Sequence, residues 1–292
     1  MNKQINFMFF LKSLGLGLII AILFKIDFWG LQIDLSLGDS FLYLWLMGFL
    51  QAVVLGYPIV RTSWSGWRLI GTVFLVYFGI ATFMTQIETV VFLQYLVDII
   101  PIENTFNLFF NGAVIAAILA PLAVIIHGKY LKTEEGTEGI AEIVMNTKQW
   151  IIKLGLVAII YAFIYILFGA LVFKPLAGAA FDEFYAGLQM PPWIVPFQMI
   201  RGIVFAFLAF PVIRMLKGSF GETGWTVSLL YSVLLASLVL PPNEFMPTTI
   251  RLAHMIELFT SMFLFGWIVT KLFYRHLTEN RPLSYFNEKR KV

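Results

Sequence analysis

The sequence predicts an all-α integral membrane protein with eight transmembrane helices. Hydrophobic residues make up 60% of the 292 positions and charged residues only 13%, whereas soluble chains are roughly 45–50% apolar and about 25% charged. A soluble domain of this size could not bury so much apolar surface, so most of it has to face lipid. The chain has no cysteine, which excludes disulfides, thiolate metal sites and cysteine nucleophiles.

Eight segments meet the requirement of a transmembrane helix for about 20 mostly apolar residues. They cover residues 13–32, 41–60, 68–88, 105–127, 154–173, 195–214, 226–241 and 249–271. The first follows two lysines, as in a signal peptide, but no small-residue cleavage site comes after it, so we expect a retained helix. The third either runs on toward Ile100 or is followed by a surface segment over Val90–Ile100. The seventh is short because Pro241 and Pro242 end it.

The distribution of lysine and arginine predicts that both termini are cytoplasmic. When eight spans are threaded from a cytoplasmic N-terminus, most of the 20 basic residues fall on the inner side, and only Lys25 and Lys174 fall on the outer side. We therefore expect a multi-pass protein of the cell (plasma) membrane, with its N- and C-termini in the cytoplasm.

A repeated motif indicates an internal duplication. YPIVR at Tyr57–Arg61 recurs as FPVIR at Phe210–Arg214, and a Gly-Trp pair follows each, at Gly66 and at Gly224. Because each half has four spans, an even number, the halves share one orientation. They should form a 4+4 parallel repeat about a pseudo-two-fold axis along the membrane normal. The proline stops or kinks each helix, and the arginines are expected to anchor at anionic headgroups.

The duplication divides the chain into four regions. We expect a first four-helix membrane repeat over residues 1–130, a cytoplasmic linker over 131–150, a second repeat over 151–276 and a cytoplasmic tail over 277–292. The linker mixes glutamate and lysine, which is typical of a solvated loop. A short amphipathic helix at the membrane surface is the alternative for this segment.

Several charged or titratable side chains lie inside predicted spans, where a charge costs at least about 2.5–3.5 kcal/mol. They are Glu88, Arg201, Arg251, His254 and Glu257, with Gln198, Asn107, Asn111 and Ser261 as secondary polar candidates. On the eighth span, helical spacing puts Arg251, His254, Glu257 and Ser261 on one stripe, which should face the bundle interior. The charged residues lie in the outer half of the bundle, where arginine and glutamate can neutralise each other.

The charged set is distributed unevenly between the halves. When the repeats are aligned, Gly48 lies opposite Arg201, Asn107 opposite Arg251 and Phe110 opposite His254. The second half therefore carries most of the charges, and Glu88 is the main contribution of the first. An asymmetric binding site and a structural ion-pair cluster would both produce this pattern.

The sequence contains no complete motif for a metal site or for a known type of catalytic site. His254 and Glu257 form an HxxE pair, but a metal site needs three or four ligands, and His127 lies at the inner end of the fourth span. We therefore expect no metal and no cofactor. The chain has no HExxH, GxSxG or Walker pattern, and no signature of nucleic-acid binding.

The sequence favours a small-solute transporter or permease with a polar site in the outer half of the bundle, rather than an enzyme. Arg201 and Arg251 would bind an anionic group, while Glu88, Glu257 and His254 would balance charge or carry a proton. Two alternatives remain: a membrane-embedded enzyme acting on a lipid or headgroup, and a non-catalytic subunit or sensor of a membrane complex. The expected partners are the lipid bilayer and a small anionic solute or lipid headgroup.

Reporter fusions test the predicted orientation. A green fluorescent protein fused at Glu135 or at the C-terminus should fluoresce, because both positions are expected in the cytoplasm, whereas alkaline phosphatase at the same positions should be inactive. A phosphatase fused at Asp182, in a predicted outer loop, is the positive control. An external signal at Glu135 or at the C-terminus would contradict the topology.

Overall fold

The computed structural model describes residues 6–30, 32–34, 39–92, 102–131, 143, 145–186, 188, 190–216, 218–243 and 246–274. Most of the predicted linker, the predicted tail and residues 93–100 lie outside these ranges. The described residues are almost entirely helical. Their only paired strands are β1 (Ile26–Asp27) and β2 (Gln32–Ile33), which are antiparallel.

Seven helical segments among the described residues are long and apolar enough to cross a membrane, so the chain is a multi-pass helical membrane protein. They are α2 (Asp39–Arg61); α3 (Gly66–Tyr77) with the π-helical η1 (Phe78–Met84) and α4 (Thr85–Thr89); α5 (Ile102–Ile126); α6 (Thr147–Phe168) with the π-helical η3 (Gly169–Phe173) and α7 (Lys174–Ala177); α9 (Ile194–Met215); α10 (Phe220–Ala236) with the 3₁₀ turn η4 (Ser237–Val239); and α11 (Thr248–Phe273). The apolar α1 (Phe7–Leu23) is shorter, at 17 residues.

The first helix lies earlier in the chain than the predicted span 13–32. Asn6 caps α1, because its side chain accepts a hydrogen bond from the Phe9 amide at 3.1 Å. After Leu23 the chain turns into the β1–β2 hairpin, which Lys25 and Asp34 close with an ion pair. Residues 24–30 and 32 therefore belong to a turn and hairpin rather than to the end of a helix.

Asn111 on α5 holds this hairpin in place. Its Oδ1 accepts a hydrogen bond from the Phe28 amide at 2.8 Å, and its Nδ2 donates to Asp27 Oδ1 at 2.8 Å. The hydrogen bond from Asn111 lowers the pKa of the Asp27 carboxyl below its ordinary value. Asn111 thus anchors a loop to a helix, which explains a polar residue at this depth.

The seventh predicted span, 226–241, also begins earlier. Ser219 caps α10, with its Oγ accepting from the Glu222 amide at 3.2 Å, so this helix starts at Phe220. The two Gly-Trp pairs consequently differ in context. Gly66 begins α3, whereas Gly224 lies one turn inside α10. The fifth span is longer than predicted, because α6, η3 and α7 together cover 147–177 rather than 154–173.

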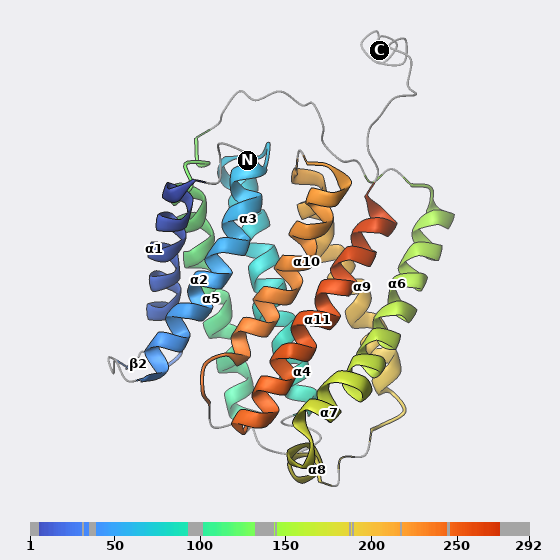
Figure 1. The fold of residues 1–292 in the computed structure, drawn as a ribbon. Coiled ribbons are helices and arrows are strands. Elements are labelled where there is room, and N and C mark those ends of the chain that lie inside the picture. The colour runs from blue at the N-terminus through green and yellow to red at the C-terminus, as the bar shows by residue number, and fades with distance from the viewer. Residues whose placement is uncertain are drawn as a thin grey trace.

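The start of α1 and the end of α11 lie at one end of the bundle, here named the terminal end (Figure 1). The opposite end, where α4, α7 and α8 (Ala179–Phe184) lie, is named the cavity end. Helix α1 packs on α2 as α6 packs on α9, and α3 packs on α5 as α10 packs on α11. Across the centre, α2 contacts α10 and α3 contacts α9. A hydrogen-bonded chain of buried polar groups also crosses the core, from Tyr77 to Gln51 at 2.8 Å and from Gln51 to Ser237 at 3.1 Å.

Glycines permit the closest helix contacts. A Cβ added at Gly266 on α11 would lie 2.7 Å from the Ser228 Cα on α10, and one added at Gly17 on α1 would lie 2.6 Å from the Phe49 Cα on α2. Real Cβ atoms do not approach backbone so closely. Small residues let the helix backbones touch, and this contact takes the place of the hydrophobic effect in lipid.

Replacing one of these glycines should weaken the bundle. Gly266→Ala should lower the stability of the protein by about 1–3 kcal/mol, because α10 and α11 must move apart. Gly155→Ala is the matched control, since a Cβ at Gly155 on α6 meets nothing within 4 Å. Thermal unfolding of both variants in one detergent measures the difference. Equal melting temperatures for the two variants would contradict the role given to Gly266.

Candidate functional site

Arg201 is the most deeply buried charged residue of the described bundle, with its side chain only 2% exposed. Its guanidinium donates to Glu88 Oε2 at 2.7 Å, to Gln198 Oε1 at 2.8 Å and to the Met84 carbonyl at 3.1 Å. Arg201 and Gln198 come from α9, whereas Glu88 and Met84 come from the third span. The predicted pairing of arginine with glutamate therefore ties the two halves of the chain together.

The polar stripe on α11 faces the bundle interior, as its spacing predicts: Arg251, Glu257 and Ser261 are all buried. Nδ1 of His254 lies 3.2 Å from Oε2 of Glu257, but the geometry is not that of a hydrogen bond. Among the described residues, His254 is the only close side-chain partner of the Glu257 carboxylate. That carboxylate is therefore buried with the His254 imidazole as its neighbour.

Arg251 is bonded to backbone carbonyls. Its Nη1 donates to the carbonyls of Val239, at 3.1 Å, and of Leu240. These carbonyls end the seventh span, where the helix dipole places partial negative charge. Arg251 therefore caps a neighbouring helix end, and its guanidinium is already engaged.

One cavity of about 340 Å³ brings Glu88, His254 and Glu257 together near the cavity end. Its wall comes from both halves of the chain, with Thr85, Glu88 and Thr89 from α4 and further residues from α6, η3, α7, α8, the end of the seventh span and α11. Neither Arg201 nor Arg251 lines it. Lys174 and the exposed Met190 also line this cavity, so it reaches the surface of the protein at the cavity end.

The π-helical turn η3 shapes one side of this cavity. Gly169, Ala170 and Phe173 of this turn line it, and π-turns are frequent at functional sites because they widen the helix locally. Aromatic side chains surround the polar groups: the Phe173 ring lies 5.1 Å from that of His254 and 6.1 Å from that of Tyr185. The cavity is therefore a mixed acidic and aromatic one.

The sequence did not point to all of the lining residues. Tyr165, Tyr185 and Lys174 line the cavity. In the sequence, nothing distinguishes them from tyrosines and lysines that lie at a membrane surface. Conversely, Asn107, Asn111 and Ser261 do not line it. Asn111 holds the hairpin, and the Ser261 hydroxyl donates to the Leu258 carbonyl of its own helix at 3.4 Å.

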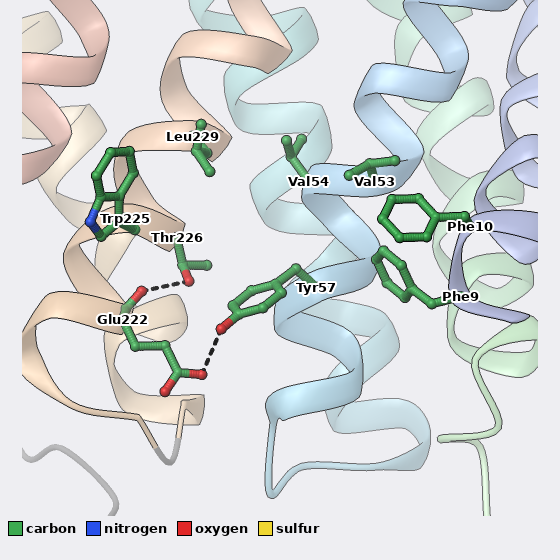
Figure 2. A pocket seen from close by; sticks show the side chains of 9 residues that line it. All are labelled: Phe9, Phe10, Val53, Val54, Tyr57, Glu222, Trp225, Thr226 and Leu229. Carbon is green, nitrogen blue, oxygen red and sulfur yellow. Dashed lines mark hydrogen bonds between the residues drawn. The ribbon is translucent and has the colours of Figure 1, made fainter. Parts of the chain in front are cut away.

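A second cavity, of about 490 Å³, lies between α10 on one side and α1 and α2 on the other (Figure 2). Its wall is mostly apolar, and Phe10 and Trp225 at its edge are 45% and 55% exposed. It opens sideways toward the surroundings of the bundle. Although larger, it has a single carboxylate in its wall, so the acidic cavity is the better candidate for a polar site.

Glu222 at the edge of this second cavity binds two residues of the first half. Tyr57 donates to Glu222 Oε1 at 2.8 Å (Figure 2), and Arg61 bonds both oxygens, at 2.5 and 3.1 Å. Arg61 was predicted to anchor at lipid headgroups, whereas the structure shows its guanidinium paired with Glu222. Nothing in the sequence indicated this pair, since Glu222 lies before the predicted seventh span.

Among the described residues, no three His, Asp or Glu side chains gather in a way that could hold a metal ion. No protein-family model, curated protein or solved structure gives a significant match to this chain. Its function therefore has to be inferred from the geometry of its own residues.

Breaking the Arg201–Glu88 pair should be costly. Arg201→Met leaves the Glu88 carboxylate without its partner, and removing one member of a buried pair costs about 3–5 kcal/mol. The double variant Arg201→Met with Glu88→Met should be more stable than Arg201→Met, because no charge is left unpaired. Thermal unfolding in one detergent measures all variants.

The exposed pair of Lys174 and Asp182, 3.1 Å apart, supplies the control. Lys174→Met should cost less than about 1 kcal/mol, as exposed ion pairs generally do. An Arg201→Met variant that unfolds at the same temperature as Lys174→Met would show that the buried pair does not stabilise the bundle.

Proposed function

We propose that this protein is a small-solute permease whose binding site is the acidic cavity. The observation that carries the proposal is the cavity itself, which gathers Glu88, His254 and Glu257 inside a helical bundle and reaches the surface at one end. Titratable residues within a membrane are costly and are typically retained for binding or proton transfer. The Arg201–Glu88 pair and Gln198 belong to the support of this site, since Arg201 fixes the Glu88 carboxylate from behind.

The proposal includes a 4+4 parallel duplication with eight spans and cytoplasmic termini, which makes the terminal end cytoplasmic and the cavity end external. The recurring pairs of packed helices support it: α1–α2 matches α6–α9, α3–α5 matches α10–α11, and α2–α10 matches α9–α3. An axis relating the halves would pass close to Thr62, the first residue after one repeated motif, and Leu216, the second residue after the other, which form an antiparallel bridge. Two-fold repeats with a site between them are common among transporters.

The terminal end is closed by contacts between the halves. The Thr62 hydroxyl donates to the Met215 carbonyl at 2.9 Å, and the Ser63 amide donates to the same carbonyl at 3.2 Å. The Arg61–Glu222 pair lies beside them. A cavity that is reached from one end and sealed at the other is one of the two states that alternating access requires. Transport would then need these terminal contacts to open.

A disulfide across the terminal end tests the proposal. The chain has no cysteine, so Thr62→Cys with Leu216→Cys introduces a single pair. Residues facing each other in an antiparallel bridge lie about 4.5–5.5 Å apart at Cα, within the usual range for a disulfide. Uptake by proteoliposomes is measured with a panel of labelled anionic, neutral and cationic solutes. Oxidation should abolish uptake of the transported solute, and a reductant should restore it.

The two single-cysteine variants are the controls, and their uptake should be insensitive to oxidation. Uptake by fully cross-linked protein at the rate of the reduced form would refute opening at the terminal end. Absence of protein-dependent uptake for every solute of the panel would refute the permease proposal.

A further inference from the structure

The cationic groups around the acidic cavity already have partners. Arg201 is bound by Glu88, Gln198 and the Met84 carbonyl, and Arg251 is bound by two backbone carbonyls. Lys174 is paired with Asp182 at 3.1 Å. An anionic solute would have to displace one of these partners. The cavity wall therefore does not suit an anion.

The carboxylate of Glu257 is the least compensated charge of the cavity wall. Its side chain is only 9% exposed, and its close side-chain partner among the described residues is His254. The Arg201 charge is neutralised by Glu88 and that of Lys174 by Asp182. With a neutral imidazole at His254, the cavity therefore retains one negative charge. With a protonated imidazole, Glu257 is neutralised.

The rings of the wall suit a cation as well. Tyr165, Phe173, Phe181 and Tyr185 line the cavity, and aromatic faces attract ammonium groups through their quadrupoles. The protein already makes such a contact at the rim of the cavity, where the Lys174 ammonium lies 5.2 Å from the centre of the Phe181 ring. A desolvated cation between these rings and Glu257 would meet both kinds of attraction.

We propose, on the basis of the permease proposal above, that the solute is a monovalent organic cation that binds between Glu257 and the aromatic rings, and that its binding displaces a proton from His254. The proton goes to the solvent at the cavity end, and the cation takes its place as the counter-charge of Glu257. The charged groups that act on His254 are Glu257 of its own helix, Glu88 of α4 and Arg201 of α9. Lys174, Tyr165 and Tyr185 line the same cavity. Proton and cation thus compete for one negative charge, which would couple their movements in opposite directions.

Three probes of similar shape separate charge from size. Choline is a cation, 3,3-dimethylbutan-1-ol is its neutral carbon analogue, and 3,3-dimethylbutyrate is a comparable anion. Titration calorimetry on the purified full chain should give choline a dissociation constant about tenfold or more below that of the neutral analogue, and no binding of the anion. The choline heat should vary with the ionisation enthalpy of the buffer, because a proton is released.

Variants assign the effect to the named residues. Glu257→Gln should remove the preference for choline over the neutral analogue, whereas Glu183→Gln, which removes an exposed carboxylate at the same end outside the cavity wall, should leave it unchanged. His254→Gln should still bind choline but release no proton. Melting temperatures close to that of the parent chain show that these variants are folded.

Equal or tighter binding of the neutral or anionic probe, or no binding of any probe, would overturn the cation proposal. The permease proposal would survive such a result if the cross-linking experiment still showed gated uptake of another solute. Choline binding without uptake of any solute would support the cation site but refute the permease proposal.

Discussion

The buried ion pair between Arg201 and Glu88 is the contact around which the cavity end is organised. A guanidinium buried in a membrane protein needs hydrogen-bond acceptors, and here the acceptors for Nη1 and Nη2 of Arg201 come from two different spans. Satisfying Arg201 therefore fixes α9 against the end of the third span. That arrangement holds Glu88 at the wall of the cavity, while the arginine itself stays behind it. A positive charge thus organises a site whose accessible surface is acidic.

The terminal end is also held by polar contacts between the two halves of the chain, but by a different set of residues. Glu222 is bound by Tyr57 and Arg61, and the Met215 carbonyl is bound by Thr62 and Ser63. Each of these bonds joins the first half of the chain to the second. The repeated Pro-x-x-Arg motif therefore ends at the junction between the halves, although its two arginines do different things. Arg61 is paired within the protein, whereas Arg214 is exposed.

Much of the fold could be predicted because lipid imposes simple rules. A helix that crosses a bilayer needs a long apolar run, and most spans were located within several residues. The predicted helix boundaries were wrong where polar side-chain contacts decide where a helix begins or ends. The Lys25–Asp34 pair and Asn111 close a hairpin where the first span was expected to continue, and the Ser219 cap starts α10 before its apolar run. Such caps and pairs are weak signals in a strongly apolar sequence.

Hydropathy and the cost of burying charge act locally along the chain, so the sequence alone was enough to assign the membrane class and most of the spans and to identify the polar residues within them. The contacts that those residues make follow from how the helices pack. Arg201 and Arg251 were expected to face a ligand, but the terminal nitrogens of Arg201 bond Glu88, Gln198 and the Met84 carbonyl, and Nη1 of Arg251 bonds carbonyls at the end of another helix. Which side of an ion pair faces a cavity depends on how helices pack, and the spacing of residues along one helix does not contain that information.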